Sequence, residues 1–198
     1  MHGSIAPQLR SLVTACVSAA CLALTLACGT YLGTRMPGYD DLSQAPRWLT
    51  GPCAAHWKDA PGSVLCAVGS AAGSPDASLL RATAIERGRA ELTHALTAKI
   101  TAMLEDHATT KTGAAELWVH SDGGQRIAHL SRLIADTARP RLAMAGDWTS
   151  EQGTYFALLA ISSEAFSDAV REMDWLSESM RRALIERSEA AFGGKARD

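Results

Sequence analysis

Cysteines are the residues of this sequence whose chemistry is easiest to read. Of the five, Cys53 and Cys66 are the two that lie beyond the first 30 residues. Two thiols about a dozen residues apart can form one disulfide in an oxidising compartment, which stabilises a fold by roughly 3 kcal/mol in the chain-entropy account. The alternative is that Cys66, within the apolar run 63–70, is a buried free thiol. We expect the disulfide, and no metal, because the residues around the two cysteines do not supply the four His or Cys ligands of a structural zinc site.

The first 27 residues have the organisation of an export signal. Arg10 is followed by seventeen uncharged residues, 11–27, and small residues precede Cys28. Residues 24–28, Leu-Thr-Leu-Ala-Cys, resemble a bacterial lipobox, whose cysteine is acylated before the signal is cleaved. We therefore predict lipidation at Cys28; an uncleaved membrane anchor and a simply cleaved signal are the alternatives. Gly29 stands where Asp would favour retention in the inner membrane, so the predicted location is the outer membrane, facing the periplasm.

The other polar residues match no common catalytic motif. Neither a Gly-x-Ser-x-Gly nucleophile turn nor a phosphate-binding loop ending in Gly-Lys-Ser/Thr occurs. We predict no cofactor and no catalytic residue, and keep as a third hypothesis an envelope hydrolase that uses Glu116, Asp147 or His120; Asp122 is a further carboxylate that could pair with them. The spacing of a helix-borne zinc site is absent from the six histidines, which are His2, His56, His94, His107, His120 and His129.

A long helix is the clearest secondary-structure element in the sequence. Ser74, Pro75 and Asp76 are typical of a helix start, and we expect the helix to reach about residue 106. Glycine within a helix costs about 1 kcal/mol relative to alanine, so Gly88 indicates a close backbone approach, which we expect to involve the first strand. The apolar stripe consists of Ile85, Gly88, Leu92, Leu96, Ile100 and Met103.

The order of the predicted elements indicates an α+β fold, with a small antiparallel sheet and helices packed on one face. The nearly continuous apolar run at 154–161 predicts a central strand, and residues 115–120 are a candidate short strand. The other predicted elements are a strand at 63–70, helices at 74–106 and 127–138, a strand at 142–148, and a final helix at 163–192.

This pattern divides the chain into four parts. They are a signal peptide at 1–27, a lipidated tether and the loop leading into the domain at 28–62, an α+β core at 63–162, and a C-terminal helix at 163–198 that packs on the core or extends from it. Trp48 and Trp57 are expected to pack where the loop meets the domain.

The final helix is the candidate docking element. A helix of about thirty residues is longer than a small domain needs to cover one face of a sheet. We place the candidate partner surface on this helix, at Trp175, Arg181 and Arg182.

Composition limits the function classes. The chain has 198 residues, a mass of 21.0 kDa and a formal charge of −2, which excludes a multidomain enzyme and argues against a nucleic-acid partner. Loss of residues 1–27 would remove one cation, Arg10, and leave 18 Lys+Arg against 21 Asp+Glu. Thirty-six alanines make the 47% hydrophobic content a generous estimate of the core.

The ordered set of motifs resembles the Lpp-twenty family of bacterial lipoproteins. The resemblance implies an anchored envelope protein with a small α+β domain and no agreed enzymatic activity, so no catalytic residues carry over. Residues 107–139 and the final helix depart from the family pattern. The motifs are Pro46-Arg47-Trp48, Ala67 to Ala71 (AVGSA), Arg89-Ala90-Glu91-Leu92, Gly146-Asp147-Trp148 and Tyr155-Phe156-Ala157-Leu158.

The sequence thus predicts a non-catalytic protein that is held to the membrane by an N-terminal lipid. We expect it to bind another envelope component, either a protein or peptidoglycan. The alternative is a regulator that docks a peptidoglycan synthase or a secretion or motility assembly through its C-terminal helix.

Overall fold

The computed structural model describes residues 41–53, 56, 63–118 and 122–193. The chain divides into two compact units, Met1–Tyr39 and Asp40–Asp198, and all the described residues belong to the second. The predicted signal peptide, Cys28, Trp57 and His120 lie outside the described residues. None of the helices within 41–53, 63–118 and 122–193 combines the length and the apolar character that a transmembrane span requires.

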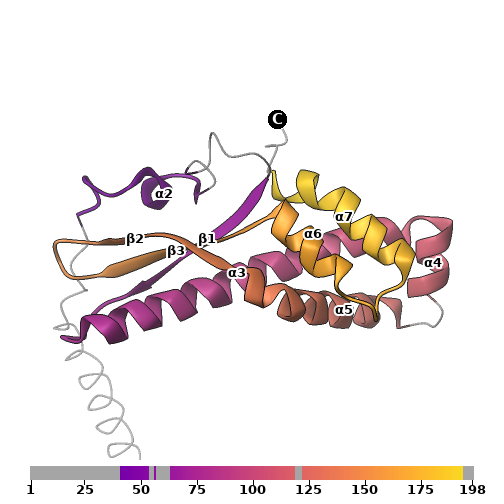
Figure 1. Cartoon of the computed structure of the whole chain (residues 1–198), viewed down its shortest axis with the longest axis horizontal. Helices are drawn as coiled ribbons and strands as arrows, with labels where there is room; N and C mark the ends of the chain where they lie inside the picture. Colours follow the sequence, from indigo (N-terminus) through magenta and orange to yellow (C-terminus); the bar gives the residue numbers. More distant parts are fainter. Residues whose placement is uncertain (1–40, 54–55, 57–62, 119–121, 194–198) are drawn as a thin grey trace, which may run out of the picture. The chain divides into compact units, whose positions relative to one another are not determined.

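The sheet has three antiparallel strands, β1 (Val64–Ala71), β2 (Ala143–Thr149) and β3 (Tyr155–Ser162), in the order β1-β3-β2. The prediction that residues 154–161 form the central strand is confirmed. Leu158, Leu159 and Ile161 are buried because β3 is covered on both faces of the sheet. The α+β class is therefore present, with the three strands lying along one half of a long helix (Figure 1).

The long helix is α3 (Ala77–Ala108), and its predicted stripe faces the core. Asp76 is the N-cap: its Oδ1 accepts hydrogen bonds from the backbone N–H groups of Ser78 at 2.8 Å and Leu79 at 3.2 Å. Ser74, expected at the cap, instead accepts a hydrogen bond from the Asp76 N–H at 3.1 Å. The cap is shifted because Asp76 satisfies two unpaired helical N–H groups at once.

Two glycines bring β1 and α3 into backbone contact. Gly88 lies directly against β1, and a Cβ built on it would lie 3.0 Å from the Gly69 nitrogen. A Cβ on Gly69 would overlap the Ala84 carbonyl oxygen and the Gly88 nitrogen. The close approach predicted from Gly88 is thus confirmed, and its partner on the first strand is Gly69.

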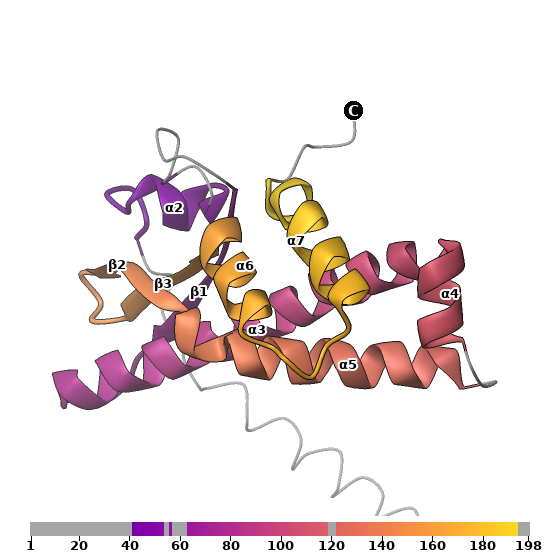
Figure 2. The ribbon, with the colours of Figure 1, turned by 45° about the vertical axis from the view of Figure 1, so that its right-hand side comes forward.

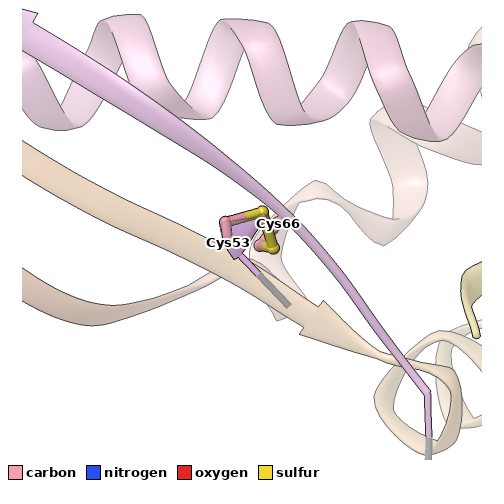
Figure 3. The surroundings of a disulfide bond; sticks show 2 residues. All are labelled: Cys53 and Cys66. Carbon is pink, nitrogen blue, oxygen red and sulfur yellow. A yellow bond between two sulfur atoms is a disulfide. The ribbon is translucent and has the colours of Figure 1, made fainter. Parts of the chain in front are cut away.

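The opposite face of the sheet is covered by the segment that precedes β1. Its short helix α2 (Arg47–Thr50) buries Trp48 near Gly146 of β2. Cys53 follows α2 and forms a disulfide with Cys66 of β1, with their Cα atoms 6.1 Å apart (Figure 3). The disulfide therefore attaches the covering segment to the sheet.

Five shorter elements complete the fold, and three of them, α4, α5 and α7, pack directly against α3 (Figures 1 and 2). They bury the apolar faces of Ile127, Ile134, Phe166 and Leu184. The elements are α4 (Lys111–Leu117), α5 (Gly123–Ala138), the 3-10 turn η3 (Arg139–Arg141), α6 (Ser163–Arg171) and α7 (Glu178–Phe192).

The strand predicted at residues 115–120 is wrong, because residues 111–117 form α4. The hydroxyl of Thr110 caps this helix by accepting from the Gly113 N–H at 3.0 Å. Gly113 is needed because any Cβ there would overlap the carbonyl oxygen of His107. A local cap and a close backbone approach thus outweigh the strand preference of the residues that follow.

The single final helix at 163–192 is also wrong, because the chain turns at residues 172–177 and forms two helices. Ser177 begins the second by accepting from the Met180 N–H at 3.2 Å. The turn lets α7 fold back on α6, so that the rings of Phe166 and Phe192 are 5.3 Å apart. The C-terminal segment therefore packs on the core.

Substitution of Gly69 by alanine should destabilise the fold by about 3 kcal/mol or more, at the upper end of overpacking costs. The atoms that the new Cβ would overlap are backbone atoms of α3, which cannot rotate away. Gly124→Ala is the matched control, since a Cβ there meets nothing within 4 Å. Urea denaturation followed by circular dichroism measures both variants, and equal unfolding free energies would contradict the proposed close contact.

Loss of the disulfide should lower the unfolding free energy by roughly 3 kcal/mol, the chain-entropy value for a loop of about this length. The cysteines are 13 residues apart in sequence. The Cys53→Ser, Cys66→Ser double variant and the reduced native protein should show the same loss in denaturation. An unchanged midpoint on reduction would mean that the pair does not constrain the chain.

Candidate functional site

The three residues predicted as a partner surface lie together, on the turn after α6 and the start of α7. Trp175 is in the turn with 46% of its surface exposed. Arg181 pairs with Glu178 at 2.9 Å and with Asp174 at 3.6 Å. Arg182 lies 3.5 Å from Glu178, and 65% of its side chain is exposed. We call Trp175, Glu178, Arg181 and Arg182, together with Arg171, the α6–α7 surface.

An open groove of about 550 Å³ runs along this surface, lined by Arg171, Glu178, Arg181, Arg182, Ile185 and Glu186. Exposed ion pairs of this kind contribute little to stability, so the arginines can exchange their carboxylate partners at low cost. A guanidinium binds a carboxylate through two parallel hydrogen bonds. The arginines of the groove can therefore accept an acidic group of a partner.

A partly buried polar cluster fixes the start of α7. His107 of α3 is 5% exposed, and its Nε2 lies 3.3 Å from Oε2 of Glu116 on α4. The other carboxylate oxygen accepts a hydrogen bond from the hydroxyl of Ser179 on α7. Ser179 also lies 3.0 Å, oxygen to oxygen, from Ser177, the N-cap of α7. This His107–Glu116–Ser179 cluster joins three helices and orients the turn that carries Trp175.

The environment of Glu116 favours its charged form. Partial burial raises the pKa of its carboxyl, but the hydrogen bonds from Ser179, His107 and Ser177 together outweigh burial and lower the pKa below its ordinary value. The carboxylate is therefore ionised at neutral pH, as its role as a hydrogen-bond acceptor requires.

The order of groups in this cluster does not suit nucleophilic catalysis. A nucleophilic serine needs an imidazole that accepts its proton, with the carboxylate behind the imidazole. Here the carboxylate of Glu116 lies between the serine and the histidine, so Ser179 donates to a weak base. The arrangement can hold helices together, but it cannot activate Ser179.

The other carboxylates of the hydrolase hypothesis have separate surroundings. Asp147 on β2 accepts a hydrogen bond from the hydroxyl of Tyr155. Burial, with added contributions from this bond and the charge of Asp147, raises the pKa of Tyr155 to about 12. Asp122 precedes α5. The hydrogen bonds of the described residues thus do not join Glu116 to Asp147, and those residues contain no group of three or more His, Cys, Asp or Glu suited to a metal.

Trp175, Arg181 and Arg182 are close in sequence, and their role as a partner surface stays a prediction, whereas the contacts of the His107–Glu116–Ser179 cluster were not predicted from the sequence. Glu116 is a predicted candidate only as a hydrolase carboxylate, and the strand predicted at residues 115–120 gives no indication that it joins α3 to α7. A signal was present at Ser177 and Glu178, since a hydroxyl N-cap followed by a carboxylate in the first turn is typical of a helix start. That signal predicts a break in the final helix at this position.

No protein-family model matches the chain, and no curated protein matches it significantly. The similarity to the Lpp-twenty family consequently remains a proposal that rests on the motifs quoted above.

Protonation of Glu116 should weaken the fold as the pH falls. Because its pKa is lowered in the folded protein, its stabilising effect is present above the unfolded-state pKa and is lost as the pH falls through the folded-state pKa. Glu116→Gln should cost about 1 to 2 kcal/mol at pH 7 and reduce the loss of stability between pH 6 and pH 3.

Denaturation at several pH values measures this effect, with Glu105→Gln on an exposed position of α3 as the control. If the Glu116→Gln protein loses as much stability between pH 6 and pH 3 as the unsubstituted protein, the carboxylate does not hold the three helices together.

Proposed function

We propose that this protein is a lipid-anchored component of the bacterial outer membrane, facing the periplasm, that binds another envelope component through its α6–α7 surface. It resembles the Lpp-twenty family, and we propose that it acts by binding and not by catalysis. The observation that carries the binding role is the exposed Trp175 in the turn before α7, a helix that carries Arg181 and Arg182 and whose start is fixed by the partly buried His107–Glu116–Ser179 cluster.

Tryptophan and arginine are the residues that most often dominate binding energy at protein interfaces. Single exposed apolar side chains are common on protein surfaces, so the proposed binding role rests on the tryptophan and the arginines together. The arginines favour a partner segment that carries carboxylates, which both acidic protein segments and the peptide stems of peptidoglycan provide. We favour a protein partner, because exposed aromatic and arginine side chains are enriched at protein interfaces.

The proposed location is supported by two independent features. Arg10, the apolar residues 11–27 and Cys28 have the order of a lipoprotein signal. The Cys53–Cys66 disulfide suits a domain that folds in an oxidising compartment, because structural disulfides are rare in the cytosol.

The alternative is a regulator that docks a peptidoglycan synthase or a secretion or motility assembly through its C-terminal helix. A helix of thirty residues does not support this alternative, because α6 and α7 are separate helices that pack against each other. The alternative now depends on the same α6–α7 surface and differs in the identity of the partner.

Cys28→Ala should abolish incorporation of radiolabelled palmitate and release the protein from the membrane fraction. The acyl chains are the proposed anchor, and removing the thiol removes their attachment site. Cys16→Ala serves as the matched control and should label normally. Palmitate labelling that persists in Cys28→Ala would contradict the anchoring proposal.

Trp175→Ala combined with Arg182→Glu should reduce recovery of the crosslinked partner at least tenfold, since loss of a central interface residue costs about 2 kcal/mol or more. The measurement is chemical crosslinking in living cells followed by quantitative mass spectrometry. Leu79→Ala, which removes an exposed apolar side chain from the start of α3, is the control. Equal recovery from the variant and the control would contradict binding at the α6–α7 surface.

A further inference from the structure

The two edges of the sheet differ in how they are protected. The edge strand β2 has an irregularity between Met144 and Gly146, and such bulges discourage pairing with another strand. The other edge, β1, pairs with β3 in an unbroken register of eight residues. A regular edge strand of this length is a template for one more strand.

The register identifies the backbone groups that β1 directs outward. The Ser163 N–H donates to the Ser63 carbonyl at 2.9 Å, so the pair just before β1 is a hydrogen-bonded pair. Hydrogen-bonded and non-hydrogen-bonded pairs alternate along an antiparallel ladder. The N–H and C=O groups of Val64, Cys66, Val68 and Ser70 therefore point away from β3.

The contact made by Arg87 agrees with this assignment. Its guanidinium donates to the Ser70 carbonyl at 2.8 Å from outside the sheet. In the part of the chain that the structure describes, no other hydrogen bond reaches the outward groups of Cys66 and Val68. Among the described residues, the N–H and C=O groups of Cys66 and Val68 are consequently available to a further strand.

A groove of about 520 Å³ lies along this edge, lined by Ala67, Val68, Gly69, Ser70, Arg87, Ala90 and Glu91. Alanine and glycine leave the β1 backbone accessible. A second hollow, lined by Ala82, Thr83, Glu86, Arg87 and Ala90, continues from the groove along α3. The free edge and the adjoining helix face thus form one surface.

The surface carries one charge of each sign, so that two copies of it can be complementary. Arg87 and Glu91 are one helical turn apart, and neither forms an ion pair within the described residues. If a two-fold axis makes the β1 strands of two copies antiparallel, it makes their α3 helices antiparallel as well, because β1 and α3 are held together at Gly69 and Gly88. Such an axis brings Arg87 of one copy opposite Glu91 of the other.

We propose that β1 pairs antiparallel with β1 of a second copy, about a two-fold axis near Val68, and so forms a continuous six-stranded sheet. Val68 faces its own counterpart, and Cys66 faces Ser70 of the other copy. The Ser70 carbonyl has a second lone pair beside its hydrogen bond from Arg87, so the outward backbone groups become paired. The α3 helices approach each other through Ala82 and Ala90, whose small side chains permit close packing. This surface is separate from the α6–α7 surface, so both can be occupied at once.

A charge exchange between two differently tagged full-length chains, co-expressed in bacteria and extracted in mild detergent, tests the proposal. Unsubstituted copies should co-purify. Arg87→Glu alone and Glu91→Arg alone each place like charges across the axis, and either should reduce co-purification at least tenfold. Co-expression of the Arg87→Glu chain with the Glu91→Arg chain should restore it, because each then meets an opposite charge.

Arg182→Glu, the same charge change on exposed α7, is the control and should leave self-association unaltered. Circular dichroism of each variant checks folding, and Glu91→Arg removes no contact within one copy. The proposal is overturned if unsubstituted copies do not co-purify, if either single variant still self-associates, or if the mixed pair fails to recover. Co-purification of a different protein in place of the second copy would equally overturn it.

Discussion

The backbone contact between Gly69 and Gly88 fixes the arrangement on which the rest of the structure depends. Without side chains between them, β1 and α3 approach more closely than any other residue pair would allow. The contact sets both the level and the direction at which the helix crosses the sheet. A helix of 32 residues is about 48 Å long, so a small change at Gly88 would displace its far end considerably.

That far end is the support for the second half of the molecule. Ile100, Leu104 and His107 lie on the C-terminal part of α3 and are buried by α4, α5 and α7. His107 begins the chain of polar contacts that continues through Glu116 to Ser179. The orientation of the α6–α7 surface thus follows from the glycine contact through a rigid helix and a cluster of hydrogen bonds.

The elements with a strong local signal could be predicted from the sequence. The continuous apolar run of β3 and the helical stripe of α3 each indicate one structure, and Gly88 is unfavourable in a helix unless something lies against it. The break in the final helix could not be read from periodicity, because Met173 and Leu176 are buried in the turn just as they would be in a continuous helix.

The candidate site was predictable only in part. Trp175, Arg181 and Arg182 are close in sequence. They remain on one short segment although two helices replace the single helix that was expected. The contact between Glu116 and Ser179 joins residues 63 positions apart, and no local pattern encodes such a contact. Long-range polar contacts of this kind depend on how the helices pack and become visible only in the folded structure.

Site-specific photo-crosslinking in living cells tests the central claim, which is that the α6–α7 surface binds an envelope partner. The photoreactive residue is placed in turn at position 175 or 182 on that surface and at position 79 or 133, where exposed leucines lie on α3 and α5. The account predicts one recurrent envelope adduct at 175 and 182 and none at 79 and 133. Adducts to that component at 79 or 133, with none at 175 and 182, would contradict it.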